Sequence, residues 1–331
     1  MKTYVRAGFF LALFFLAAVR SAGAAAAPLT RVVMTTGSFA EREGVVYVAQ
    51  DQGFFRKYGL DLSFVQVRSG PVGMSALTGG ETQFHWGSVT GANIGAIAEG
   101  ADIVFIAGFI NKLTGAFVVN SKIKSPQELK GKTLGVNSLS GGGWIFTMLA
   151  LDHWGLDPKR DGINIRSLGS DGVRTEALSS GVIDGCQIGY TFAAQLQQKG
   201  FRVLADLEKL PIPYQGSGLQ ARRAFVTSSP AVVENTLRGL LDAVAFIRNR
   251  ENKAAVMKSL TRGLRLSRLE DAEEGYNSIV DIYEKKIYPS TQGIANVIRL
   301  LGQTNEKIKR LKAEDLVETS AVKKLEREGR F

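Results

Sequence analysis

Residues 30–67 read TRVVMTTGSFAEREGVVYVAQDQGFFRKYGLDLSFVQV, with two apolar runs on either side of a helical segment. The runs at 31–35 and 61–67 are short and rich in Val, Thr and Phe, as buried strands are. Between them, residues 45–58 have the length and apolar spacing of a helix, followed by Gly59. Because a helical crossover joins strands that run in the same direction, this stretch predicts a β-α-β unit.

The alternation of strands and helices continues along the chain and repeats once. Further strands are expected at residues 84–88, 103–108, 116–120, 133–137, 164–168, 186–188 and 219–226. The motif GLD at residues 59–61 recurs at 155–157, and ALxxG at 76–80 recurs at 177–181, at offsets of 96 and 101 residues. Motifs that recur in the same order predict two α/β lobes of similar construction, with parallel or mixed sheets.

Two connections mark where the chain passes between the expected lobes. A polar turn lies at Asn111-Lys112, and a Pro- and Gly-rich stretch lies at residues 211–218. Beyond residue 226 the chain is mainly helical, with apolar residues at helical spacing. The expected first lobe comprises residues 28–112 and 219–331, including C-terminal helices that wrap it. The expected second lobe comprises residues 113–218 with the hinge segments.

The first 27 residues follow the three-part plan of an export signal. Lys2 and Arg6 are basic, residues 7–19 are apolar, and residues 21–27 are rich in small side chains. A membrane anchor needs about 20 apolar residues, whereas Arg20 interrupts this run. We therefore expect residues 1–27 to be a cleaved signal peptide and the protein to be periplasmic.

Charge and composition narrow the classes of partner. The chain holds 41 basic and 31 acidic residues, a formal net charge of +10, and three of the basic residues lie in 1–27, which leaves +7 for the rest. Export and the dispersed placement of Lys and Arg argue against nucleic acid and favour an anionic ligand. The chain has one cysteine, Cys186, and two histidines, His85 and His153. We therefore expect no internal disulfide, metal site, cofactor or catalytic residues.

Three motifs together resemble the nitrate/sulfonate/taurine class of ABC-transporter substrate-binding proteins, whose fold is shared with thiamine-pyrimidine precursor proteins. They are AxDxGFFxKxGLD at residues 49–61, SPxELKGKxLGV at 125–136 and ALxxGxxD at 177–184. The resemblance covers roughly residues 30–260. It implies an α/β fold of the type II periplasmic binding proteins, in which two lobes joined by hinge crossings close over a ligand. The first lobe departs from the pattern, with Gln83 where the acid of ALxxGxxD usually stands.

The most distinctive candidate site is the loop SLSGGGW at residues 138–144, between an expected strand and an expected helix. The free main-chain N–H groups and the dipole at such a helix start favour an anion. Serine hydroxyls can donate to its oxygens, and an indole can stack on an apolar or aromatic body. No Lys-Ser/Thr pair follows the glycines, so this is not a nucleotide-binding P-loop. The candidate residues here are Ser138, Ser140, Gly141, Gly142 and Trp144.

Other candidates follow the carboxyl ends of neighbouring strands, where open α/β sheets bind ligands. They are Ser38, Phe39, Ser69, Trp86, Ser88 and Thr90 in the first lobe, and Asp171 and Tyr190 in the second. Glu41 and Arg42 lie beside the first of these loops as polar partners. Asp171 also suits the start of a helix as a cap.

These features predict a monomeric, periplasmic solute-binding component of an ABC importer. It is expected to capture a small organic anion, such as a sulfonate or a carboxylate, and to deliver it to a membrane permease and, through it, to the ATPase. Two alternatives stay open: a protein that binds or makes a pyrimidine precursor, and a ligand sensor without transport. The resemblance implies that synthesis of such a precursor needs a cysteine-rich motif with histidine, which the single cysteine disfavours.

Overall fold

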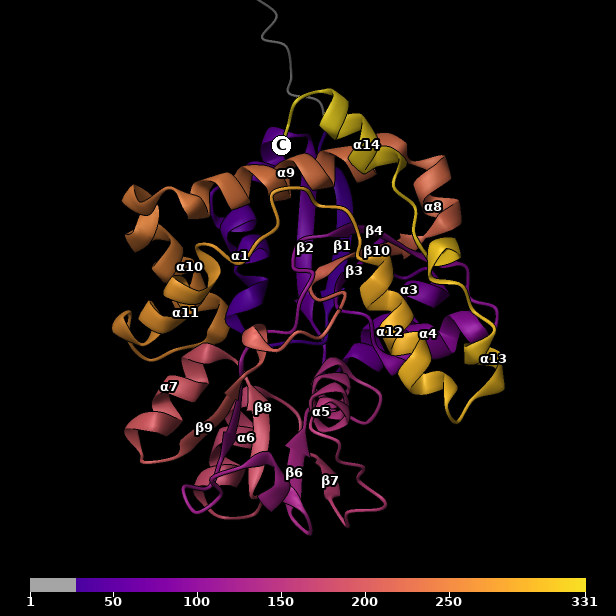
Figure 1. Ribbon diagram of the computed structural model, residues 1–331. Helices are drawn as coiled ribbons and strands as arrows, with labels where there is room; N and C mark the ends of the chain where they lie inside the picture. The colour runs from indigo at the N-terminus through magenta and orange to yellow at the C-terminus, as the bar shows by residue number, and fades with distance from the viewer. Residues whose placement is uncertain (1–27) are drawn as a thin grey trace, which may run out of the picture.

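The computed structural model describes residues 28–331, and the predicted signal peptide lies outside this range. Two five-stranded sheets, one in each lobe, form its framework (Figure 1). The first sheet contains β1 (Thr30–Thr36), β2 (Leu60–Gln66), β3 (Phe84–Gly87), β4 (Ile103–Gly108) and β10 (Gly218–Arg222), in the order β2-β1-β3-β10-β4. The second contains β5 (Ala116–Val119), β6 (Thr133–Val136), β7 (Asn164–Ser167), β8 (Gly185–Ile188) and β9 (Arg202–Asp206), in the order β7-β6-β8-β5-β9.

The two sheets share one pairing pattern. Strand β1 runs parallel to β2 and β3, and β6 runs parallel to β7 and β8. Strand β10 is antiparallel to β3 and β4, and β5 is antiparallel to β8 and β9. In each sheet the antiparallel strand is the first that the chain forms after crossing from the other lobe. The predicted α/β class with two similar mixed sheets is therefore confirmed.

Two predicted elements end earlier than their sequence pattern suggests. The expected strand 219–226 stops at Arg222, which pairs with Ile103 at the start of β4, so no ladder partner remains beyond it. The chain continues as α8 (Arg223–Ser228). The expected helix 45–58 is broken at Gly53, whose φ of 70° is left-handed.

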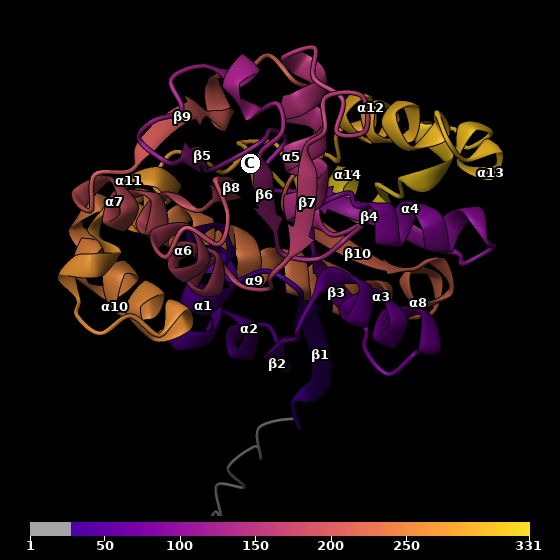
Figure 2. The same ribbon diagram turned by 90° about the horizontal axis from the view of Figure 1, so that it is seen from below.

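Most helices of each lobe begin just after the carboxyl end of a strand. In the first lobe they are α1 (Gly44–Asp51), α2 (Phe54–Lys57), α3 (Gly70–Gly79) and α4 (Gly91–Ala98), with the short 3-10 turn η1 (Glu41–Glu43) before α1. In the second they are α5 (Gly142–His153), α6 (Asp171–Ser179) and α7 (Tyr190–Gln198), with the turns η2 (Pro126–Leu129) and η3 (Leu207–Lys209). Seen from below, α5, α6 and α7 surround the second sheet (Figure 2). Helix starts from both lobes therefore lie close to the gap between the sheets.

The C-terminal third of the chain is helical and covers mainly the first lobe. Its elements are α9 (Pro230–Arg248), η4 (Arg250–Asn252), α10 (Lys253–Leu264), η5 (Glu270–Ala272), α11 (Glu273–Ile279), α12 (Thr291–Gly302), α13 (Glu306–Lys309), η6 (Ala313–Leu316) and α14 (Ser320–Arg327). Helix α9 packs on α1 and α2, α10 packs on α1, and α14 packs on α9 (Figure 1). Helix α12 lies against α4, whereas α11 also reaches α7 of the second lobe.

The position of Gln83 explains how the first lobe departs from the ALxxGxxD pattern. In the second lobe, Asp184 Oδ2 accepts a hydrogen bond from the N–H of Thr133 at 2.8 Å. In the first lobe, Gln83 Oε1 accepts from the N–H of Val33, also at 2.8 Å. An amide oxygen therefore replaces the carboxylate at the equivalent place, and the turn before β3 keeps the same anchor.

Apolar packing holds the lobes together near the two crossings, which run through residues 109–115 and 207–217. One cluster of buried side chains includes Phe105 of the first sheet, Phe117 of the second and Tyr214 of the second crossing. The Tyr214 hydroxyl donates to the carbonyl of Val89 at 2.6 Å, and its ring meets that of Phe146 edge-on at 5.0 Å between centroids. The crossings are thus fixed by side chains of both lobes.

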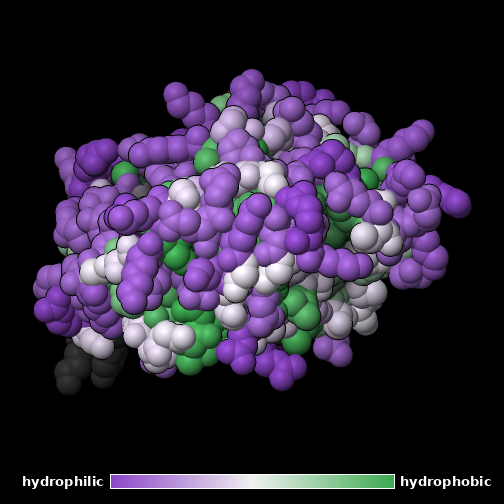
Figure 3. Space-filling model, turned by 60° about the horizontal axis from the view of Figure 1, so that its bottom comes forward, coloured by the Kyte–Doolittle hydropathy of each residue, from purple (hydrophilic) through white to green (hydrophobic). Residues whose placement is uncertain are grey.

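The face of the molecule that Figure 3 shows is largely polar. Figure 3 shows hydrophilic side chains over most of the visible face, with hydrophobic side chains in small, separate areas. Among residues 28–331, no helix combines the length and the apolar character needed to cross a membrane.

Candidate ligand-binding site

A cavity of about 290 Å³ lies between the lobes, at the carboxyl ends of strands from both sheets. The first lobe lines it with Gly37, Ser38, Phe39, Arg42, Gln66, Val67 and Arg68, and the second with Asn137, Gly143, Gly169, Ser170, Asp171, Arg174 and Gln187. This is the place where open α/β sheets bind ligands. Its volume suits a small organic molecule rather than a drug-sized one.

A recess of about 30 Å³ adjoins the cavity and shares Ser38, Arg42 and Asn137 with it. Its other walls are Thr36, Gly37, Glu43, Gly70, His85, Trp86, Gly87, Ser88, Thr90 and Gly142. A space of this size holds a water molecule or the oxygen atoms of a small head group. The cavity and the recess together therefore suit a ligand with a compact polar head and a larger body.

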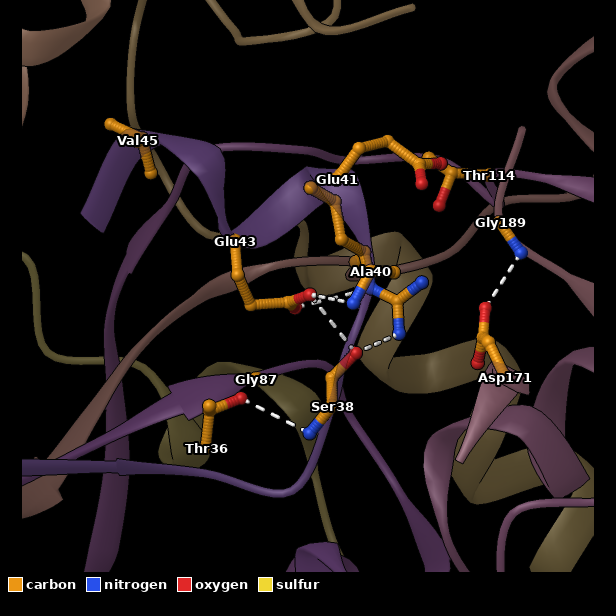
Figure 4. A network of polar contacts seen from close by, with 12 residues as sticks. Thr36, Ser38, Ala40, Glu41, Glu43, Val45, Gly87, Thr114, Asp171 and Gly189 are labelled. Carbon is orange, nitrogen blue, oxygen red and sulfur yellow. Dashed lines mark hydrogen bonds and ion pairs between the residues drawn. The ribbon is translucent and has the colours of Figure 1, made fainter. Parts of the chain in front are cut away.

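In the first lobe, a hydrogen-bonded group holds Arg42 at the cavity wall. The Ser38 hydroxyl accepts a hydrogen bond from the Arg42 guanidinium and donates to Glu43 Oε2 at 3.1 Å (Figure 4). Glu43 Oε2 also accepts from the N–H of Ala40 at 3.0 Å, and Glu43 Oε1 lies 3.4 Å from Arg42 Nε. The turn η1 thereby places one arginine and one carboxylate side by side at the site.

Both glutamates of η1 are buried, which disfavours their charged forms. Glu43 is fully buried, and burial raises its pKa to about 7 although Arg42 and the N–H of Ala40 oppose the change. Burial also raises the pKa of Glu41, and the nearby charge of Asp171 adds to the effect. Glu43 is therefore only partly ionised near neutral pH.

In the second lobe, Asp171 and Arg174 form a buried ion pair at the start of α6. Arg174 Nη2 lies 2.6 Å from Asp171 Oδ1, and the Arg174 guanidinium also donates to the carbonyls of Gly169 and Gln187. The second oxygen of Asp171 accepts from the N–H of Gly189 at 2.8 Å (Figure 4). Arg174 is 2% exposed, and its Nε has no hydrogen-bond partner among residues 28–331. The pair fixes the loop before α7 as well as the cavity wall.

The electrostatic balance of the lining favours an anion. Three arginines, Arg42, Arg68 and Arg174, line the cavity, against one carboxylate, Asp171. Helix α5 also begins here, with Gly143 in the cavity wall and Gly142 in the recess, and the N-terminus of a helix carries partial positive charge.

The glycine-rich loop before α5 packs closely against neighbours from both lobes. A Cβ on Gly143 would lie 2.9 Å from Asn137 Oδ1, and a Cβ on Gly142 would lie 3.0 Å from Ser88 Oγ in the first lobe. The oxygens Asn137 Oδ1 and Ser138 Oγ are buried without hydrogen-bond partners among the described residues. Glycine is therefore needed here for close approach of the main chain rather than for flexibility.

The structure brings some of the predicted site residues to the cavity and places others away from it. Ser38, Phe39 and Asp171 line the cavity, and Ser38, Trp86, Ser88, Thr90 and Gly142 line the recess. Ser69, Ser138, Ser140, Gly141, Trp144 and Tyr190 line neither. Of the loop 138–144, only Gly142 and Gly143 reach these two spaces, so the part of this loop in ligand binding stays a prediction.

Of the four aromatic candidates, Trp144 and Tyr190 lie outside the site and Trp86 only borders the recess, each for a physical reason. Trp86 is fully buried in the core of the first lobe, 5.3 Å from the ring of Phe109, because its strand turns this side chain inward. The Tyr190 hydroxyl donates to Asp206 Oδ1 at 2.6 Å, in a separate surface pocket. Trp144 packs against the apolar cluster of the crossings. Phe39 is thus the aromatic side chain that lines the main cavity.

Several lining residues were not among the predicted ones, among them Gln66, Arg68, Asn137, Arg174 and Gln187. Gln66 and Asn137 lie at or just after the ends of β2 and β6, so the strand-end rule could have found them. Arg174 follows Asp171 by three residues, a spacing that places both on one face of a helix. Gln187 lies inside β8, where no local pattern marks it.

The histidine and the cysteine near the site have little reactivity. Burial lowers the pKa of His85 to about 4, and its Nδ1 lies 3.0 Å from Thr35 Oγ1. Burial raises the pKa of Cys186 to about 12, so the thiol stays protonated. Within residues 28–331, no group of three His, Cys, Asp or Glu side chains is placed to hold a metal ion.

Several solved structures share this fold at low sequence identity. The alkanesulfonate-binding protein SsuA from Xanthomonas axonopodis pv. citri, bound to MOPS, is 20% identical with a TM-score of 0.72, over 89% of this chain and 100% of that chain. The periplasmic nitrate-binding protein NrtA from Synechocystis PCC 6803 is 12% identical with a TM-score of 0.74, over 91% and 89%. A DszB mutant in complex with biphenyl-2-sulfinic acid is 17% identical with a TM-score of 0.60, over 90% and 99%. No curated protein matches the sequence.

The family comparison extends the likeness from fold to sequence. Residues 43–254, well over half of the chain, match the family described as NMT1/THI5 like. This segment holds nine of the ten strands and most of the cavity wall. The resemblance inferred from the sequence motifs is therefore confirmed. The chain belongs to the NMT1/THI5-like family and has the two-lobed α/β fold of the type II periplasmic binding proteins.

Proposed function

We propose that this protein is the periplasmic solute-binding component of an ABC importer and that it captures a small organic anion between its lobes. The observation that carries the proposal is the cavity between the sheets, lined by three arginines and one carboxylate. The fold relatives that bind an alkanesulfonate and nitrate support an anionic ligand, since both of those ligands are small anions.

The positions of the lining groups determine which part of the ligand each group contacts. Arg42 lies between the cavity and the recess, so the head group of the anion binds beside it and beside the start of α5. The body of the ligand lies in the main cavity, against Phe39 and Val67. Arg68 is exposed at the edge, where it adds long-range attraction that salt weakens.

Ligand capture depends on movement of the two lobes about the crossings. We assign residues 28–112 and 219–331 to the first lobe and residues 113–218 to the second. Closure brings lining residues of both lobes onto one ligand, so the anion stabilises the closed form by its contacts with the second lobe. The closed form is the one that the membrane permease accepts.

Binding without catalysis fits the chemistry of the lining. The main cavity is lined by neither histidine nor cysteine, and the recess histidine, His85, is neutral near pH 7. A pyrimidine precursor, the alternative ligand, is a neutral heterocycle, so it gains nothing from the excess of arginines over carboxylates in the cavity wall. Binding measurements with anions and with neutral pyrimidines therefore distinguish the two functions.

Thermal unfolding of residues 28–331 tests the proposal against alkyl and aromatic sulfonates, carboxylates, nitrate and pyrimidines. A ligand at 100 times its dissociation constant adds about 2.7 kcal/mol of stability, which raises the melting temperature by several degrees. The expected result is a rise with at least one class of anion, and the loss of that rise in Arg42→Gln. A rise with neutral pyrimidines alone would contradict the anion site.

A further inference from the structure

Glu43 lines the recess of the site, although a binding site for anions has no evident need for a buried acid. Its side chain is fully buried, it lines the recess, and it lies next to Arg42. Oxygen Oε2 accepts hydrogen bonds from Ala40 and Ser38, whereas Oε1 has no hydrogen-bond partner among residues 28–331 (Figure 4). An ionised Glu43 would compete with a bound anion for the same guanidinium.

The groups that face Glu43 leave Arg42 as its counter-charge. Glu41 of the same turn adds negative charge. The hydroxyls of Tyr47 in α1 and of Tyr283 after α11 are neutral, because burial raises the pKa of both phenols. His85, across the recess, is neutral near pH 7 because burial lowers its pKa to about 4. A second negative charge placed beside Arg42 is therefore not compensated by any of these groups.

We propose that Glu43 matches the charge of the site to that of its ligand by taking up a proton when an anion binds beside Arg42. The inference rests on the proposed function and names the residue that carries the proton. In the overall step, one anion and one proton enter the site, the carboxylate of Glu43 becomes a carboxyl group, and no covalent bond of the ligand changes. The neutral carboxyl group then offers an O–H donor where a carboxylate would repel the ligand.

The ionisation of Glu43 in the protein without ligand supports this role. Burial raises its pKa to about 7, so near neutral pH the free protein holds a mixture of both forms. An anion beside Arg42 weakens the interaction that favours ionisation, and the pKa rises further. Affinity for a fully ionised ligand is then constant below the pKa of the free protein and falls by up to tenfold for each pH unit above it.

Titration calorimetry at about pH 8 tests the proposal with methanesulfonate, benzenesulfonate and nitrate, which stay ionised throughout the range. Buffers with different ionisation enthalpies give the number of protons taken up for each anion bound. The expected value for the wild-type protein is close to one proton, and Glu43→Gln is expected to bind the same anion with no proton uptake and with an affinity independent of pH. Glu81→Gln, which removes an exposed carboxylate outside the site, is the control, and its proton count should stay that of the wild type.

The possible outcomes test the role of Glu43 and the capture of an anion separately. Binding without proton uptake by the wild-type protein would overturn the role of Glu43 but leave anion capture intact, even if Glu43→Gln fails to fold. Loss of the proton in Glu81→Gln, or its persistence in Glu43→Gln, would also overturn it. If none of the anions binds at any pH, the proposed function fails and the inference fails with it.

Discussion

Glu41 Oε1 in the first lobe accepts a hydrogen bond from the main-chain N–H of Tyr190 in the second lobe, at 2.8 Å. Glu41 is 3% exposed, and Tyr190 is the first residue of α7. A second contact joins the lobes where the N–H of Ala92 in α4 donates to the carbonyl of Ser140 at 3.1 Å. Helices α7 and α4 lie on opposite sides of the molecule in Figures 1 and 2. The two contacts therefore join the lobes on either side of the cavity. The contact of Glu41 with Tyr190 is called the first closure, and the contact of Ala92 with Ser140 is called the second closure.

Removal of the first closure should weaken ligand binding. Glu41→Ala removes the acceptor of the Tyr190 N–H, and this loss affects only the closed form. The closed form should be destabilised by about 1–2 kcal/mol, which raises Kd by roughly five- to thirtyfold. Glu41→Gln keeps an acceptor oxygen and should lose less. Titration calorimetry gives the affinities, and small-angle X-ray scattering reports whether the mean shape becomes more open. Equal affinity in the wild type and in Glu41→Ala would show that the contact does not contribute to closure.

The second closure is tested by two glycines of one helix. A Cβ on Gly91 would lie 2.9 Å from Ser140 Cβ across the gap, whereas a Cβ on Gly95 meets nothing within 4 Å. Gly91→Ala should therefore push the lobes apart and lower ligand affinity by roughly tenfold or more, since overpacked contacts cost about 1–3 kcal/mol. Gly95→Ala should bind as the wild type does, and its helix should be more stable by up to about 1 kcal/mol. Similar affinities in the two variants would argue against closure at this contact.

The arginines of the site should differ in their effects on binding. Arg42→Gln removes charge-assisted hydrogen bonds to the anion, each worth about 1.5–3 kcal/mol, and should lower affinity by roughly 10- to 100-fold. Arg68→Gln removes an exposed charge and should lower affinity only severalfold, by an amount that shrinks at high salt. Calorimetric titrations at low and high salt separate the two. An Arg42→Gln protein that keeps wild-type affinity would exclude Arg42 from the head-group site.

Arg174 should matter for folding as well as for binding. Its removal leaves the buried carboxylate of Asp171 without its cation, and loss of one partner of a buried pair costs about 3–5 kcal/mol. Arg174→Ala should therefore lower the free energy of unfolding by about that amount in a urea titration. Arg166→Ala, which removes an exposed arginine of β7, should stay within about 0.5 kcal/mol of the wild type. A stable Arg174→Ala protein would mean that Asp171 is held by Gly189 alone.

Glu43 should make stability depend on pH in a defined window. Its pKa is about 7 in the folded protein, above its ordinary value of 4.5, so the folded state binds this proton more tightly than the unfolded state. The stability that it contributes is complete below pH 4.5 and is lost as the pH rises to 7, about 3 kcal/mol in all. The difference in unfolding free energy between the wild type and Glu43→Gln, measured by urea titration across this window, isolates the effect. A constant difference would mean that Glu43 ionises normally.

The sequence predicted the architecture better than the site. The paired motifs GLD and ALxxG reflect the main-chain geometry of each lobe, and even the substitution at Gln83 preserves the hydrogen bond that Asp184 makes in the second lobe. Such patterns are local, because one turn and one neighbouring strand determine them. The two-lobed fold was therefore accessible from residue spacing alone.

The site depends on which face of an element each side chain occupies and on contacts between distant segments. Trp86 and Tyr190 follow the strand-end rule, yet the first turns into the core and the second toward Asp206. Arg174 lines the cavity because Asp171, Gly169 and Gln187 hold its guanidinium there. The spacing of Asp171 and Arg174 is compatible with their pairing. No spacing within the chain encodes how this pair lies relative to Arg42 of the other lobe, so the shared charged lining appeared only in the structure.

The central claim is that the cavity selects negative charge, and one matched pair of ligands tests it most directly. Benzenesulfonate and benzenesulfonamide have nearly the same shape, but only the first carries a charge near neutral pH. Titration calorimetry of residues 28–331 should show benzenesulfonate binding at least tenfold more tightly, and the difference should disappear in Arg42→Gln. Equal binding of the two, or tighter binding of the sulfonamide, would contradict capture of an anion at this site.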